Sequence, residues 1–135
     1  MPELSLPVRA HRGAAVKVFV RPRGGAPASA GPVAAYLDTG ASVCVLDPGL
    51  VGVLGLEPVA AAGLHVLGRE GVSHHHLYEI EVGIAAEGGE AVWVPVLALG
   101  GPVNPKGTAA VLGRDFLARF TLTYDGPAGR FTLRW

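Results

Sequence analysis

The segment AAYLDTGASVCVLD, residues 34–47, places a single carboxylate inside an apolar run that reads as β-strand. Asp38 follows the apolar residues, and the positions after it carry the small residues Thr39, Gly40 and Ala41. Because an isolated carboxylate costs free energy to bury, Asp38 needs either a cation or a second carboxyl group that shares its proton. The next Lys or Arg along the chain is Arg69, although folding could bring in a more distant one.

A second carboxyl group beside Asp38 would have a chemical use. Two carboxyl groups about 3 Å apart cannot both ionise, so one pKa falls and the other rises. One group can then act as general base on a water while the other acts as general acid on a carbonyl oxygen, as peptide-bond hydrolysis requires. Gly40 would let the backbone approach the carboxylate, and the Thr39 hydroxyl could brace the loop.

Composition limits the classes of function. The 135 residues suit one domain, residues 1–135, and 50% hydrophobic residues with 16% charged residues allow a real core. The formal net charge of zero argues against nucleic-acid binding and removes self-repulsion between copies. Cys44 is the only cysteine, so no internal disulfide can form. With no apolar stretch of signal-peptide or membrane-span length, we expect a cytoplasmic protein that does not bind membranes.

Short strands dominate the pattern. The 20 Gly and 11 Pro indicate many tight turns. Alternating or β-branched segments predict strands over residues 16–20, 33–38, 43–46, 64–67, 72–84, 91–99, 109–112, 120–124 and 131–135. Asp47 and Pro48 predict the start of a short helix that ends at Gly55, and residues 114–120 predict a second one. The expected fold class is all-β with one or two short helices.

Two motifs carry a resemblance to a known family. YLDTGAS resembles the active-site motif of aspartic proteases. AAVLGRDFL, residues 109–117, resembles their second signature, and Gly113, Arg114 and Asp115 match its retroviral form. The resemblance is to single-lobe, retropepsin-like enzymes, of which this chain looks like a cellular, bacterial member. It implies a closed, barrel-like acid-protease fold in which Gly113, Arg114 and Asp115 give structural support.

The resemblance also implies a mechanism. One motif in 135 residues implies a homodimer in which Asp38 of each copy activates a water to hydrolyse a peptide or protein substrate, with no metal or other cofactor. The C-terminal strand ending at Trp135, or the N-terminal strand, would form the shared sheet. The hairpin tip between the two motifs corresponds to the substrate-covering flap. Its residues are Leu67, Gly68, Arg69, Glu70, Gly71 and Val72.

The sequence departs from the viral pattern at one point. Viral enzymes carry acidic residues after the small residues of the motif, and the arginine of the second motif pairs with one of them. Here Ser42, Val43 and Cys44 occupy this segment, so Arg114 needs another partner, for which Asp47 is a candidate.

Other interpretations stay open. The fold could serve as a catalytically silent peptide-binding module, or the motif could be a coincidence in a structural domain. His74, His75 and His76 suggest a metal site, but successive strand residues point to opposite faces, so we expect solvated histidines. Cys44, within an apolar strand, is expected to act as a small buried hydrophobic residue.

Overall fold

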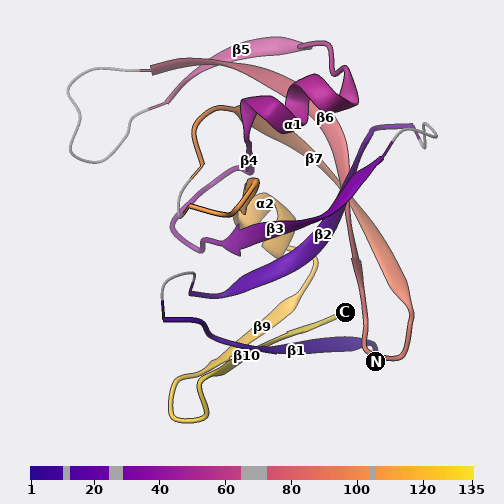
Figure 1. The fold of residues 1–135 in the computed structure, drawn as a ribbon, viewed down its shortest axis with the longest axis vertical. Helices are drawn as coiled ribbons and strands as arrows, with labels where there is room; N and C mark the ends of the chain where they lie inside the picture. Colours follow the sequence, from indigo (N-terminus) through magenta and orange to yellow (C-terminus); the bar gives the residue numbers. More distant parts are fainter. Residues whose placement is uncertain (11–12, 25–28, 65–72, 104–105) are drawn as a thin grey trace.

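The computed structural model describes residues 1–10, 13–24, 29–64, 73–103 and 106–135. Strands form most of the molecule, with two short helices between them (Figure 1). In chain order the elements are β1 (Glu3–Pro7), β2 (Ala15–Pro22), β3 (Ala30–Leu37), β4 (Val45–Leu46), α1 (Pro48–Leu54), β5 (Ala60–Leu64), β6 (Ser73–Ala85), β7 (Ala91–Gly100), β8 (Ala110–Leu112), α2 (Arg114–Leu117), β9 (Thr121–Asp125) and β10 (Arg130–Arg134).

Six strands close into a barrel. Their order is β2-β3-β8-β4-β7-β6, and the ring closes because β2 also pairs with β6. β3 runs parallel to β8 and β4 runs parallel to β7, whereas the other neighbours are antiparallel, and β5 extends the sheet beyond β6. The barrel interior is apolar; its fully buried side chains include Val16, Val18, Val20, Leu46, Ile80, Val82, Val94 and Leu112. The predicted all-β, barrel-like fold class is confirmed.

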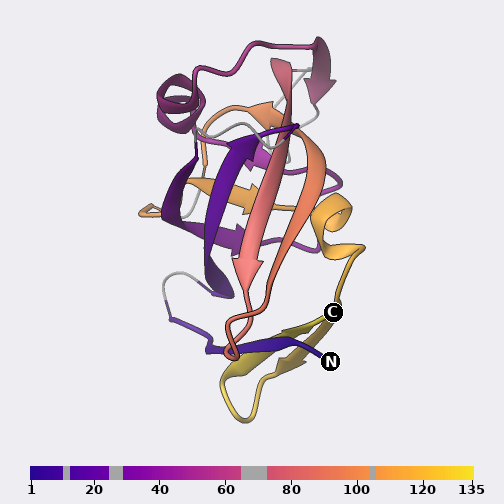
Figure 2. The same cartoon turned by 90° about the vertical axis from the view of Figure 1, so that its right-hand side faces the viewer.

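A second sheet lies at one end of the barrel (Figures 1 and 2). It is antiparallel, with the order β1-β10-β9. One of its faces buries Phe131 and Leu133 against the core. The C-terminal hairpin β9–β10 was predicted from its alternation. β1 is a strand that the sequence pattern does not predict, because its pairing partner lies at the other end of the chain.

Local signals place α1 correctly. The Asp47 side chain accepts a hydrogen bond of 2.8 Å from the Gly49 amide, and Pro48 occupies the first turn. Gly55 ends the helix in the left-handed conformation, with φ 61°. The predicted start and stop of this helix are therefore confirmed.

Several boundaries differ from the prediction, and those of α2 and β5 have an identifiable cause. α2 ends at Leu117 instead of residue 120, because Phe120 already donates its amide to the Leu117 carbonyl in a closing turn. β5 begins at Ala60, earlier than the predicted 64–67, because pairing with β6 overrides the weak strand preference of alanine. The expected flap residues 67–72 lie outside the described residues. Within the described parts of the chain, neither helix has the length and apolar character needed to cross a membrane.

Candidate active site

Asp38 stands directly after β3, at the rim of the barrel. β3 lies between β2 and β8, and the Asp38 amide continues this pairing with a 3.0 Å hydrogen bond to the Leu112 carbonyl. The chain then turns, because the Ala41 amide donates to the Asp38 carbonyl at 3.2 Å. The Asp38 side chain is half-buried, while Thr39 and Gly40 are exposed. The carboxylate therefore sits at the surface on a turn secured by two barrel strands.

Gly40 shapes the surroundings of the carboxylate. Its amide donates a 2.8 Å hydrogen bond to Oδ1 of Asp38. A Cβ at position 40 would lie 3.1 Å from the same oxygen, which is tighter than ordinary van der Waals contact. The absence of a side chain thus leaves Oδ1 accessible to its amide donor, while Asp38 makes no ion pair among the residues that the structure describes.

The second motif packs directly against this turn. The Arg114 amide donates to the Ala41 carbonyl at 2.8 Å, and the Arg114 guanidinium donates to the Thr39 carbonyl at 2.8 Å. A Cβ on Gly113 would lie 2.7 Å from the Val43 carbonyl oxygen. The two motifs, which are far apart in sequence, therefore form one unit in which the second holds the first.

The partner of Arg114 differs from the candidate named from the sequence. Asp47 caps α1, and the Arg114 side chain bonds instead to the Thr39 carbonyl. The sequence could not indicate this, because a backbone carbonyl carries no residue-specific signal. Thr39 takes part in this contact through its backbone carbonyl, and its hydroxyl makes no hydrogen bond to the residues that the structure describes.

Replacing Arg114 tests whether this contact positions the turn. Arg114→Gln removes a charge-assisted hydrogen bond, so we expect the free energy of unfolding to fall by about 1 kcal/mol, measured by urea titration. Arg114→Lys should restore part of this loss. Arg119→Gln is the matched control, because this exposed arginine follows the same helix and its side chain makes no hydrogen bond or ion pair to described residues. Equal losses in both glutamine variants would contradict a positioning role for Arg114.

The Asp115 side chain, in α2, links this helix to the segment just before β4. Its carboxylate accepts hydrogen bonds from the Cys44 amide at 3.2 Å, the Cys44 Sγ at 3.2 Å and the Phe116 amide at 2.8 Å. Cys44 is fully buried, as expected for a small core residue. Asp115 therefore holds Cys44 in place, at the end of the segment 38–44 that begins with Asp38.

Cys44 is expected to be chemically inert in the folded protein. Burial raises the pKa of the Cys44 thiol well above its ordinary value, and the adjacent Asp115 carboxylate raises the pKa further. Because the thiolate is the reactive form, alkylation by iodoacetamide at pH 8 should be undetectable in the native protein and complete in guanidinium. Mass spectrometry measures both, and rapid native labelling would contradict the buried, protonated thiol.

One of the histidines does not lie as predicted. His75 is partly buried, with its Nδ1 3.0 Å from the Gly100 carbonyl oxygen, whereas His76 is exposed. The expectation of solvated histidines is therefore wrong for His75, because Gly100 of the adjacent strand lies within its reach. Among the described residues, no group of three His, Cys, Asp or Glu side chains is placed to hold a metal ion.

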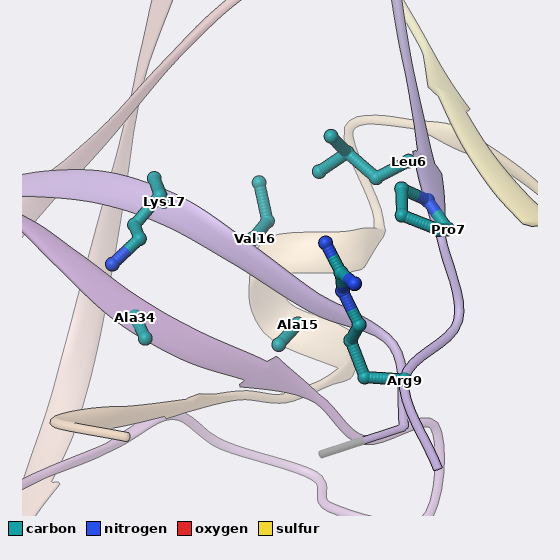
Figure 3. A pocket seen from close by; sticks show the side chains of 7 residues that line it. All are labelled: Leu6, Pro7, Arg9, Ala15, Val16, Lys17 and Ala34. Atoms are coloured by element: carbon teal, nitrogen blue, oxygen red, sulfur yellow. The ribbon is translucent and has the colours of Figure 1, made fainter. Parts of the chain in front are cut away.

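Two of the pockets lined by described residues lie beside the barrel strands, away from Asp38. One, of about 220 Å³, opens between β1 and the β2–β3 edge, with Arg9 and Lys17 beside apolar side chains (Figure 3). The other, of about 350 Å³, lies between α1 and the start of β6 and includes His75 and Tyr78. The sequence pattern predicts neither pocket, because the first depends on how three successive strands pack together and the second joins segments distant along the chain. Asp38 lines neither of them.

Comparisons with known proteins show the class of fold. No protein-family model matches the sequence, and no curated protein matches it. The structure of a retropepsin-like aspartic protease from Rickettsia conorii is similar, with a TM-score of 0.63 and 18% identity over 97% of this chain and 89% of that one. The chain thus has the fold of retropepsin-like aspartic proteases, as the resemblance in the sequence implied.

Two further structures match less well. The protease of EIAV, in complex with the inhibitor HBY-793, has a TM-score of 0.43 and 20% identity over 78% of this chain and 86% of that one. The retroviral protease-like domain of Ddi1 from Leishmania major has a TM-score of 0.43 and 15% identity over 69% of this chain and 71% of that one.

Proposed function

We propose that this protein is an aspartic peptidase whose active site forms between two identical chains. Asp38 of each copy would hold one catalytic water, with a single proton shared between the two carboxyl groups. The ionised group would take a proton from the water, which attacks the carbonyl carbon of the scissile bond. The protonated group would donate to the carbonyl oxygen, giving a tetrahedral intermediate. The proton taken from the water would then pass to the amide nitrogen, so that the C–N bond breaks and the amine leaves.

One observation carries this proposal. In a chain with the retropepsin-like fold, the turn of Asp38 and Gly40 is held at its carbonyl oxygens by Arg114 and packs against Gly113. Such a turn keeps a half-buried carboxylate in a defined place at the barrel rim, which a catalytic acid or base requires. Asp38 supplies only one of the two carboxyl groups, and in this proposal the second comes from another copy.

The remaining parts of the site follow from the same proposal. An extended peptide would lie across the paired Asp38 turns, and residues 67–72 would cover it and exclude water during the reaction. Neither a metal ion nor an organic cofactor takes part in this mechanism, because the acid and the base are both carboxyl groups.

The test is the dependence of cleavage on protein concentration. A library of extended peptides is incubated with the protein across the pH range, and cleavage is followed by mass spectrometry. Because one chain carries half a site, the activity per mole of chain should fall on dilution through the dimer dissociation constant. Constant activity per mole in a monomeric sample would overturn the shared site. A stable dimer that binds peptides and cuts none would indicate the silent peptide-binding module.

A further inference from the structure

The three-stranded sheet β1-β10-β9 has two edges, and they differ. β10 is the central strand, so its backbone groups are paired on both sides within the chain. The C-terminal strand therefore has no free edge to offer a partner. Only the outer edges of β1 and β9 remain.

The edge of β1 is closed within the same chain. The Glu3 carbonyl accepts a 3.2 Å hydrogen bond from the Glu87 amide, and the Ser5 amide donates to the Glu87 carboxylate at 3.3 Å. Pro7 has no amide hydrogen to donate. Proteins commonly protect the edge of a sheet by covering it with a loop or by placing a proline on it.

The edge of β9 is open. The pairing of β10 with β1 shows which backbone groups of β10 face β1. Just beyond the two ends of this pairing, the Val8 amide donates to the Gly129 carbonyl and the Trp135 amide donates to the Pro2 carbonyl. The backbone N–H and C=O groups of successive residues in an antiparallel strand point to alternate neighbouring strands. In β10, the backbone groups of residues 131 and 133 therefore point to β1, and those of residues 130, 132 and 134 point to β9. The opposite residues of β9 are 121, 123 and 125, so the backbone groups of Leu122 and Tyr124 point away from the sheet.

The side chains of β9 support this reading. Tyr124 lies opposite Phe131, on the face of the sheet that packs on the core, yet it is 61% exposed. Phe131, in contrast, is buried. The apolar face of the sheet thus continues onto β9, where Leu122 packs partly against the core and Tyr124 is left exposed. None of the hydrogen bonds of the described residues uses the amide or carbonyl of Leu122 or Tyr124.

We propose that β9 pairs antiparallel with β9 of a second copy, which joins the two three-stranded sheets into one. With the two-fold axis at Thr123, Leu122 of each copy lies opposite Tyr124 of the other, and the outward backbone groups of both residues are satisfied. The only charge on the strand, Asp125, then faces Thr121 of the other copy, so the two carboxylates are not opposed. This inference rests on the proposed function, since it names the surface that brings the two Asp38 turns into one assembly.

A disulfide tests the register. Two residues that face each other in a non-hydrogen-bonded pair have Cα atoms about 4.5 Å apart, within the range that a disulfide spans. Thr123→Cys should therefore give a covalent dimer under mild oxidation, about ten times faster than Thr121→Cys, which is also exposed but lies opposite residue 125 of the other copy. Buried Cys44 does not compete. Equal rates for the two variants would overturn this register.

A proline tests the edge itself. Tyr124→Pro removes an amide that makes no bond within the chain, so circular dichroism should show an unchanged fold while sedimentation shows a dissociation constant raised about tenfold or more. Tyr124→Ala is the control, because it removes the ring and keeps the amide; it should weaken the dimer less. A Tyr124→Pro protein that still dimerises like wild type overturns the β9 pairing.

These results separate the two proposals. If Tyr124→Pro remains a dimer and cleaves peptides, the β9 pairing is wrong and the peptidase proposal stands. If the oxidised Thr123→Cys dimer forms as expected but neither it nor wild type cleaves any peptide, the pairing stands and the peptidase proposal is wrong.

Discussion

Asp38→Asn is expected to lower peptide cleavage by about 10²–10⁴-fold, the range attributed to a positioned acid or base. The amide cannot take a proton from water, so the pair loses its base. The fold should survive, because the Asn side-chain oxygen can still accept the Gly40 amide that now bonds to Oδ1. Peptide cleavage, thermal unfolding and sedimentation are measured on the same sample. Cleavage at the wild-type rate would refute the role of Asp38.

Mixing the Asp38→Asn variant with wild type sharpens this test. If each site needs Asp38 from both chains, variant copies inactivate the wild-type copies with which they pair. After full exchange of an equal mixture, only about a quarter of the dimers carry two aspartates, and total activity should fall to about half that of the wild-type component alone. Unchanged activity in a mixture with demonstrated exchange would indicate that each chain works independently.

Gly113→Ala is expected to lower both stability and activity. The added Cβ would meet three backbone atoms: it would lie 2.7 Å from the Val43 carbonyl oxygen, 2.8 Å from the Ala41 carbonyl oxygen and 2.8 Å from the Val43 carbonyl carbon. Backbone cannot move aside as a flexible side chain can, so the turn of Asp38 must shift. We expect the free energy of unfolding to fall by about 1–3 kcal/mol, as for other overpacked sites. Urea titration measures this, and kcat reports the displaced turn.

Gly52→Ala is the matched control. Gly52 lies in α1, and a Cβ there has no neighbour within 4 Å. Since alanine is the better helix residue, this variant should gain roughly 0.5–1 kcal/mol. If Gly113→Ala were as stable and active as wild type, the close packing between the two motifs would not matter for function.

The sequence predicted the features that depend on local chemistry. Asp47, Pro48 and Gly55 define α1 because capping and left-handed backbone depend on the residue at one position. Alternation predicted the C-terminal hairpin, and the two motifs predicted the fold that the structure confirms. In each case, a few adjacent residues carry the whole signal.

Features formed by distant segments could not be predicted in this way. β1 exists because it pairs with β10, and β5 consists largely of alanine and pairs with β6. The partner of Arg114 is a backbone carbonyl, which any residue could supply. The closed edge of β1 depends on Glu87, whose place beside Ser5 follows only from the completed fold.

The contact between Arg114 and Thr39 spans 75 positions of the chain. During synthesis, Asp38 therefore emerges from the ribosome long before the residues that hold its turn in place. The barrel seam between β2 and β6 is likewise a non-local pairing, which makes the fold slow to complete. A nascent or truncated chain that ends before residue 113 therefore contains Asp38 but lacks Gly113 and Arg114, the residues that hold its turn in place.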